Sequence, residues 1–553
     1  MDFVDVVVST TNSTQYNQFL SANNFGHKPF QEDCFEWCMK KEQQQQRCGG
    51  IVALEMGLGK TIVMLALMIC NPKDQTLIVV PKSLLSQWKT ILEKITPKLS
   101  ILIYHNTYNR IKKLSQSDLK KHQVILTTYA HVSKQSKKPD EIKFLNTFHW
   151  NRVILDEAHH ASHSKTGTYL GLNTLKSNMM WMMTGTPVQN KEKEMLNLLS
   201  LIKSSTSSAS PTLKDMIYYR SKSNVGIQMP PLNESNIIVK SGSVAEEEFS
   251  KHIHSFVDYC NVRMKQPALQ ILDEEEEINP RMIAMKYFTL ARQVCVYPPM
   301  LNRKMVQYEK HYNRSHTDAS DASDVCNMYT SVSKIDAIVN TINSRINNGC
   351  GKIILCYFYE EIDAIATRLK EYNNKGENHN NLRIVKFDGR QTKKKRDEVL
   401  TKPADILIGQ IKICSEGLNL QEYYSEVYFT SPHFNPAVEQ QAIARCWRIG
   451  QQKEVNVFRF INQYTKDQTQ QHTMDSYAEK IHEVKKHILS KFEEEVMRTP
   501  MPPPLIRREK PANPAKPANP AKPANPAKPA NPAKPANPAK PAKRILKIKK
   551  KIQ

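Results

Sequence analysis

Short apolar runs rich in β-branched residues recur along the chain in two separate series. Within each series, the runs alternate with longer segments of helical or mixed character. Continuous apolar strands separated by helices are typical of a parallel sheet that is buried on both faces. The first series comprises residues 51–53, 77–80, 124–126, 153–155 and 180–183, and the second comprises 353–356, 384–387, 406–408, 427–429 and 455–458. The sequence therefore predicts an α/β protein with two parallel sheets, each flanked by helices.

The rest of the chain divides into segments that belong to neither series. The stretch between the two series is polar and favours helix, so we interpret it as a helical insertion and linker between two lobes. The expected domains are an N-terminal lobe over residues 1–205, the insertion over 206–330, a C-terminal lobe over 331–465, a helical segment over 466–506 and a disordered tail over 507–553.

The tail repeats the hexapeptide Lys-Pro-Ala-Asn-Pro-Ala from Lys510 and ends in a stretch rich in lysine, residues 543–551. Such a segment cannot bury a core and favours an extended, polyproline-like chain. The net charge of the whole chain is +24, and residues 507–553 hold 14 basic residues and one acidic residue. This charge favours a polyanionic partner, most often nucleic acid. The alternative for the tail is that it only keeps the protein soluble.

Cysteine usage and apolar patterning exclude several protein classes. The 11 cysteines are scattered and include no C-x-x-C pair, which argues against a disulfide framework and a structural zinc site. The N-terminus lacks a basic stretch before an apolar run, and the longest apolar run, Ile62–Cys70, is too short to cross a bilayer. We therefore expect an intracellular protein in a reducing compartment, with no membrane partner.

A glycine-containing loop follows the first predicted strand and opens a helical run. Residues 55–61 read Glu-Met-Gly-Leu-Gly-Lys-Thr. The backbone N–H groups of such a loop can cradle phosphates, which the dipole of the following helix also favours. Lys60 can reach the β- and γ-phosphates, and the Thr61 hydroxyl can bind Mg²⁺. The usual first glycine of the pattern is replaced by Leu54, and the alternative is an ordinary junction between a strand and a helix.

An acidic pair closes the predicted strand at residues 153–155. Asp156 and Glu157 follow this strand directly, at the edge where open α/β sheets bind ligands. Asp156 suits binding of Mg²⁺ through water, and Glu157 suits orienting or deprotonating an attacking water. The alternative is a pair of surface charges.

Two arginines in the second series are three residues apart on a predicted helix, within Gln441–Gln451. Arg445 and Arg448 would share one face of that helix and point across a cleft. An arginine delivered from a second lobe can neutralise charge that develops on a γ-phosphate. The alternative is a surface pair.

Taken in order, these segments resemble those of the SWI/SNF-type ATPases of helicase superfamily two, over roughly residues 25–465. The ordered set comprises Glu55–Thr61, Asp156–His159, Thr184–Asn190, Gly417–Leu420 and Gln441–Gln451. Pro29–Gln31 is similar to a segment that reads adenine in that family. The sequence departs from the family at Leu54, where Asp is usual, and at Trp447, where His is usual. Neither departure removes a catalytic group.

The resemblance implies two RecA-like lobes with ATP bound between them and duplex DNA lying across both. It implies that Gln31 contacts adenine and that the loop residues Glu55, Met56, Gly57, Leu58, Gly59, Lys60 and Thr61 bind ATP. It assigns catalysis to Lys60, Asp156, Glu157, Arg445 and Arg448, and Mg²⁺ to Thr61 and Asp156. It assigns coupling of nucleotide state to DNA contacts to His159, Thr184, Thr186 and Gln441. It places Thr127, Thr128, Asp388, Gly389 and Gly417 near the DNA track or the cleft.

The expected function is that of a DNA-stimulated ATPase that translocates on duplex DNA and remodels or displaces DNA-bound proteins, with ATP and Mg²⁺ as cofactors. The alternatives are a strand-separating helicase, an ATPase linked to transcription machinery and a non-catalytic DNA-binding scaffold. The five intact catalytic positions argue against the scaffold. The chain also resembles compact relatives carried by large DNA viruses, which implies the nucleus, a cytoplasmic viral factory or the virion as its location.

Overall fold

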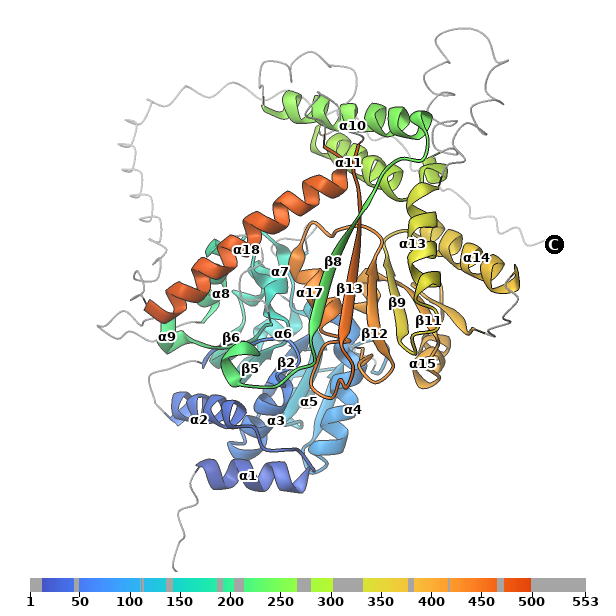
Figure 1. Cartoon of the computed structure of the whole chain (residues 1–553). Helices are drawn as coiled ribbons and strands as arrows, with labels where there is room; N and C mark the ends of the chain where they lie inside the picture. The colour runs from blue at the N-terminus through green and yellow to red at the C-terminus, as the bar shows by residue number, and fades with distance from the viewer. Residues whose placement is uncertain are drawn as a thin grey trace, which may run out of the picture. The chain divides into compact units, whose positions relative to one another are not determined.

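The predicted fold class, two parallel sheets flanked by helices, is confirmed by the computed structural model (Figure 1). All strand pairs within both sheets are parallel over the residues that the structure describes. These residues are 12–43, 49–109, 111, 114–135, 143–185, 192–202, 213–265, 280–301, 332–375, 382–415, 418–464 and 472–498. The predicted tail, residues 507–553, lies outside them.

The first sheet has seven strands in the order β3-β4-β2-β5-β6-β1-β7. They are β1 (Gly49–Leu54), β2 (Thr76–Val80), β3 (Ile101–Tyr104), β4 (Val124–Thr128), β5 (His149–Leu155), β6 (Lys176–Met183) and β7 (Ile217–Arg220). Alternate residues of each strand enter different cores, so Leu77 and Val79 face one side and Ile78 and Val80 the other. All five apolar runs predicted for this sheet lie within its strands.

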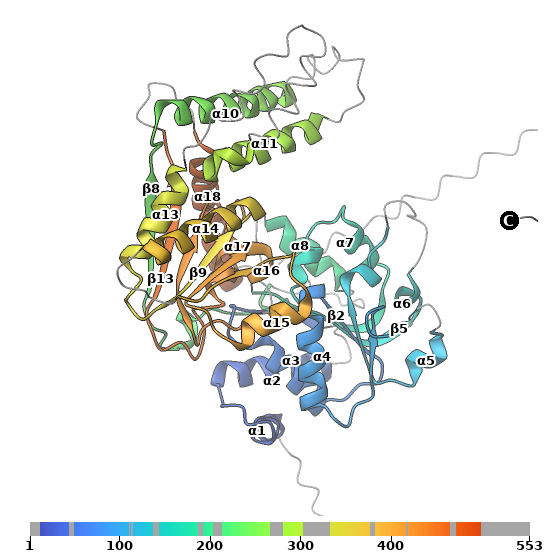
Figure 2. The same cartoon turned by 90° about the vertical axis from the view of Figure 1, so that its right-hand side faces the viewer.

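Helices cover both faces of the first sheet, and we call this assembly the first lobe (Figures 1 and 2). One face is covered by α1 (Asn12–Ala22), α2 (Pro29–Gln43), α3 (Lys60–Cys70) and α4 (Leu85–Ile95). The other is covered by α5 (Gln116–Lys120), α6 (Phe144–Thr147), α7 (Gly167–Leu172) and α8 (Glu192–Leu201). The short helix α9 (Leu213–Met216) precedes β7.

The second sheet has six strands in the order β10-β11-β9-β12-β13-β8, and with its helices it forms the second lobe (Figure 2). The strands are β8 (Leu232–Val239), β9 (Gly351–Cys356), β10 (Ile384–Phe387), β11 (Ile406–Gln410), β12 (Tyr424–Phe429) and β13 (Val455–Asn462). One face is covered by α13 (Ser333–Ser344) and α14 (Tyr359–Lys375). The other is covered by α15 (Lys393–Thr401), α16 (Ile411–Cys414) and α17 (Pro436–Ile443).

The stretch over residues 206–330 differs from the helical insertion expected there, because it also completes both sheets. β7 pairs with β1 at the edge of the first sheet, and β8 pairs with β13 at the edge of the second. The polar side chains of β8 are largely exposed, as an edge strand permits, so no apolar run signals it. The expected helices are also present: α10 (Val244–Lys265) packs against α11 (Pro280–Val296). The sheets therefore extend past the boundaries predicted at residues 205 and 331.

The last described helix, α18 (Met474–Arg498), lies within the predicted C-terminal helical segment. Its first turn joins the second lobe, where the Lys334 ammonium donates to the buried Asp475 carboxylate. Further along, Ile488 and Leu489 pack against a core of the first lobe. None of the described helices is both long enough and apolar enough to cross a membrane.

Candidate functional site

The loop between β1 and α3 adopts a backbone conformation that requires glycine. Gly57 and Gly59 have φ angles of 89° and 82°, in the left-handed region. A Cβ added to Gly59 would lie 2.4 Å from Gln31 Nε2, so the loop and α2 are closely packed. Gln31 Nε2 donates a hydrogen bond to the Leu58 carbonyl at 2.8 Å. The conformation of the loop at the start of α3 is thus fixed, and the buried side-chain amide of Gln31 packs against it.

Lys60 opens α3, and its partly buried side chain points back over the loop. Its Nζ donates to the Leu54 carbonyl at 2.9 Å. Burial lowers the pKa of Lys60, although the carboxylates of Glu157 and Asp156 act in the opposite direction. A Cβ added to Gly185 would lie 3.2 Å from Lys60 Nζ, so the segment after β6 reaches the same ammonium. Both acids and Gly185 therefore converge on Lys60.

Side-chain and backbone hydrogen bonds fix Asp156 directly after the carboxyl end of β5. Trp88 Nε1 donates to Asp156 Oδ2 at 2.7 Å, and the Glu157 N–H donates to Oδ1 at 3.0 Å. The Tyr129 hydroxyl donates to the Asp156 carbonyl at 2.7 Å. Burial, with a further contribution from Glu157, raises the pKa of Asp156 to about 6. Trp88 and Tyr129 were not among the predicted site residues.

Glu157 combines an unusual backbone with a carboxylate that stays ionised. Its φ of 49° lies in the left-handed region, where a non-glycine residue is strained. Glu157 Oε2 lies 3.3 Å from His159 Nδ1, and neither atom has a hydrogen-bond partner among the described residues. Burial raises the pKa of Glu157, but His159, Lys60 and Arg445 outweigh it and lower the pKa to about 2. Such a carboxylate is a weak base, better suited to orienting a water than to removing its proton.

The two arginines of the second lobe do not lie on a helix, contrary to the sequence prediction. α17 ends at Ile443, and Arg445 and Arg448 follow in turns that are closed by hydrogen bonds such as Arg445 N–H to the Ala442 carbonyl. The side chains of both arginines contact other segments of the second lobe. Arg445 Nε donates to the Ser415 carbonyl at 2.9 Å, and Arg448 Nη1 donates to Asn419 Oδ1.

The segment Arg445–Arg448, which we call the arginine segment, contacts the glycine loop of the first lobe. A Cβ added to Gly57 would lie 3.2 Å from Arg448 Cβ. The positive charge of Arg445 contributes to the pKa shifts of both Lys60 and Glu157. The structure thus brings the glycine loop, Lys60 and Glu157 of the first lobe close to both arginines.

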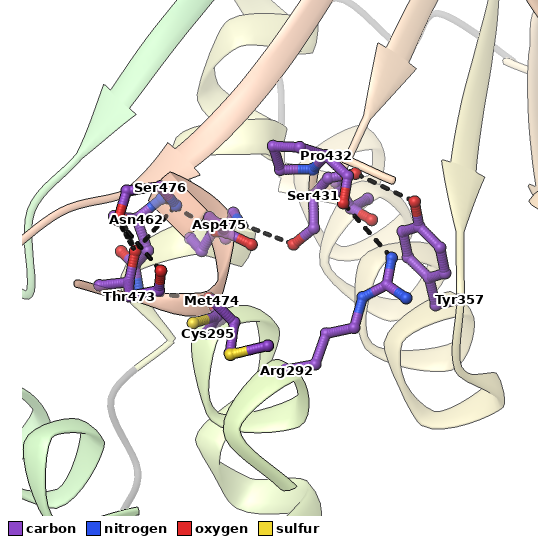
Figure 3. A network of polar contacts seen from close by, with 12 residues as sticks. Arg292, Cys295, Tyr357, Ser431, Pro432, Asn462, Thr473, Met474, Asp475 and Ser476 are labelled. Carbon is purple, nitrogen blue, oxygen red and sulfur yellow. Dashed lines mark hydrogen bonds and ion pairs between the residues drawn. The ribbon is translucent and has the colours of Figure 1, made fainter. Parts of the chain in front are cut away.

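A network on the second lobe holds the turn that leads from β12 into α17 (Figure 3). The Arg292 guanidinium, on α11, lies 3.4 Å from the centre of the Tyr357 ring and donates to the Pro432 carbonyl at 3.4 Å. The Tyr357 hydroxyl donates to the Ser431 carbonyl, also at 3.4 Å. Because α17 starts directly after this turn, α11 helps to set the direction of the chain toward the arginines.

The remaining predicted residues are less uniform in their placement. Thr127 is fully buried and donates its hydroxyl to the Tyr104 carbonyl at 2.9 Å, so this hydroxyl is used within the sheet. Asp388 is buried and accepts hydrogen bonds from Arg390, while a Cβ on the adjacent Gly389 would lie 2.8 Å from the Tyr359 hydroxyl. The side chains of Thr128, Thr184 and Gln441 are buried. Thr186 and Gly417 lie outside the described residues.

Comparisons with known proteins show which families and relatives the chain resembles. The SNF2-related domain matches residues 30–328, and the helicase conserved C-terminal domain matches residues 333–450. The chain is similar to a probable global transactivator of Orgyia pseudotsugata multicapsid polyhedrosis virus, with 22% identity over 77% of the chain and 84% of that protein. It is also similar to the ATP-dependent helicase FUN30 of Saccharomyces cerevisiae, with 24% identity over 84% of the chain, but it spans only 46% of that protein. Among solved structures, a Sulfolobus solfataricus SWI2/SNF2 ATPase core in complex with double-stranded DNA aligns with a TM-score of 0.33 and 19% identity, over 79% of the chain and 88% of that structure.

Proposed function

Because the chain belongs to the SNF2-related domain family and carries a helicase conserved C-terminal domain, we propose that it is a DNA-dependent ATPase that translocates on duplex DNA. The observation that carries this proposal is the contact between the glycine loop and the arginine segment, at Gly57 and Arg448. A site made from two lobes can open and close with each ATP, and this is what a motor requires.

In the proposed site, the two lobes contribute different charges to ATP. The loop N–H groups and Lys60 bind the β- and γ-phosphates, and Gln31 contacts adenine beside the loop. Arg445 and Arg448 neutralise the charge that develops on the γ-phosphate. Glu157 orients the attacking water, in keeping with its lowered pKa.

The side chains near Asp156 fit a magnesium ion. Glu157 Oε2 is a buried carboxylate oxygen without a hydrogen-bond partner among the described residues, and it lies one residue from Asp156. Hydroxyl and carboxylate oxygens are the ligands that Mg²⁺ prefers. We propose that Thr61 holds the ion directly and Asp156 holds it through water. The ion would neutralise charge on the β- and γ-phosphates.

Four residues are proposed to couple nucleotide state to DNA contacts: His159, Thr184, Thr186 and Gln441. The contact of His159 Nδ1 with the Glu157 carboxylate supports this role, because a shift of the His159 side chain would change the position of the Glu157 carboxylate. The net charge of +24 supports DNA as the polyanion. Gly389 and Gly417 are proposed to line the DNA track or the cleft, and the buried Thr127, Thr128 and Asp388 would support these segments rather than contact DNA.

We propose that the motor displaces proteins held on DNA, including transcription machinery, and that it does not separate strands efficiently. The viral relative described as a probable global transactivator supports a link to transcription and a location where viral DNA is transcribed, in the nucleus or a cytoplasmic viral factory.

A displacement assay tests this proposal on two substrates at the same salt concentration. We expect ATP-dependent removal of the third strand from a triplex, with little opening of a forked duplex. The variant Glu157→Gln serves as the control, since it should bind ATP and displace nothing. Efficient opening of the fork would contradict the translocase and favour a strand-separating helicase.

A further inference from the structure

We propose that Lys222 is a positioning residue, which holds the arginine segment of the second lobe against the glycine loop of the first. This inference rests on the proposed function, because it assigns Lys222 to the same ATP site. Lys222 follows β7 in the connector that leads to β8.

On one side, Lys222 is fixed to the glycine loop through Glu55. The Lys222 N–H donates to Glu55 Oε2 at 2.7 Å, and Lys222 Nζ lies 3.4 Å from Glu55 Oε1. The Glu55 N–H in turn donates to the Arg220 carbonyl at 2.9 Å. Glu55, the first residue of the loop, therefore links the loop to the start of the connector.

On the other side, the same ammonium is fixed to Trp447. Lys222 Nζ donates to the Trp447 carbonyl at 3.1 Å and lies 4.0 Å from the centre of the Trp447 ring, a cation–π distance. Trp447 Nε1 donates to the carbonyl of Pro230, further along the same connector, at 2.8 Å. Lys222 and Pro230, near the two ends of the connector, thus both contact Trp447.

The position of Trp447 makes this contact matter for catalysis. Trp447 lies in the turns between Arg445 and Arg448, so fixing its backbone carbonyl restricts where both guanidinium groups can point. A Cβ at Gly57 would lie 3.2 Å from Arg448 Cβ and 3.9 Å from Lys222 Cε, so the three residues meet at the loop. Lys222 is only 5% exposed, and a buried ammonium is costly unless it is paired, as it is here with Glu55.

The test compares Lys222→Met with Lys222→Arg in the full chain, at saturating duplex DNA. Methionine keeps the length of the side chain without its charge, and arginine can restore both the ion pair and the ring contact. We expect Lys222→Met to lower kcat by roughly ten- to a hundredfold with KM for ATP little changed, as misplacement of catalytic groups does. Lys222→Arg should recover most of the loss. The control is Lys352→Met, which removes another buried, paired lysine at the amino end of β9, an inner strand of the second sheet, and should lower Tm with kcat kept.

Substitutions of Trp447 examine the other side of the contact and decide the matter if Lys222→Met does not fold. Trp447→Leu removes the ring and should lower kcat as Lys222→Met does, while Trp447→Phe keeps a ring and should cost only a few-fold. In the double variant, the losses should not add. Wild-type kcat in Lys222→Met, or equal activities of Trp447→Leu and Trp447→Phe, would overturn this inference. Wild-type protein without DNA-stimulated hydrolysis would instead overturn the proposed function.

Discussion

The two lobes hold their parts of the candidate site in different ways. In the first lobe, Asp156 and Gln31 are buried and Lys60 is partly buried near the ends of regular elements, and each makes a hydrogen bond of 2.9 Å or less. In the second lobe, Arg445 and Arg448 lie in turns beyond α17 and are tied to Ser415 and Asn419. We infer that the first lobe preorganises the phosphate chemistry, and that the second delivers charge that can be repositioned as the lobes move.

The largest expected effect on kcat comes from removing the positive charges that the second lobe contributes to the site. Arg445→Ala and Arg448→Ala should each lower kcat by about 10³-fold or more, since an arginine that stabilises a γ-phosphate contributes on that scale. ATP affinity should change much less, because the first lobe still binds the phosphates. Steady-state hydrolysis and binding of a fluorescent ATP analogue measure the two quantities.

The matched control for the arginines is Arg368→Ala. Arg368 belongs to the same lobe but pairs with Asp336 at the surface, 3.4 Å away, and an exposed pair contributes little. If the loss of kcat in Arg445→Ala and Arg448→Ala were no larger than in Arg368→Ala, the second lobe would not supply the catalytic charge.

Within the first lobe, Glu157→Gln and Lys60→Ala should separate chemistry from binding. Glu157→Gln should lower kcat by about 10²- to 10⁴-fold with ATP still bound, because only the orientation of the water is lost. Lys60→Ala should also weaken ATP binding, since it removes the charge on the phosphates. Turnover of Glu157→Gln at the wild-type rate would show that the acid is misassigned.

A smaller effect is expected from Trp88→Phe, which removes a hydrogen bond that lowers the pKa of Asp156. In the proposed mechanism hydrolysis requires ionised Asp156, so kcat/KM of the wild type should fall as pH drops below about 6. Without the Trp88 donor the pKa rises further, so the fall should begin at a higher pH. The lost buried hydrogen bond should also cost about 1–3 kcal/mol of stability.

Trp150→Phe is the control for this pH profile. Trp150 is equally buried, and its Nε1 donates to the Leu145 carbonyl at 3.0 Å, near the amino end of β5. Its loss should cost similar stability and leave the pH profile in place. A pH profile that shifts equally in both variants would mean that ionisation of Asp156 does not cause the fall in kcat/KM at low pH.

How much of the fold the sequence predicts depends on burial. The central strands of both sheets were predicted because continuous burial selects apolar runs. The missed strands β3, β7 and β8 all lie at sheet edges. An edge strand has a neighbour on one side only, and the exposed polar side chains of β8 look like a linker in the sequence.

The same contrast applies to the site. The loop at Gly57 and Gly59 could be recognised because its backbone demands glycine. The supporting contacts of Trp88 and Lys222 could not, because they join residues 68 and 225 positions apart in the chain. The end of α17 at Ile443, before the arginines, was likewise not indicated by helical spacing.

The measurement that tests the central claim most directly is the rate of ATP hydrolysis by the wild-type protein with four additions: no nucleic acid, single-stranded DNA, duplex DNA and RNA. All four are measured at one salt concentration, because binding to a polyanion depends strongly on salt. If the ATP site is made from both lobes and closes when the protein is bound to duplex DNA, the highest rate of hydrolysis is expected with duplex DNA. Equal rates in all four, or a higher rate with single strands than with duplex, would contradict the account.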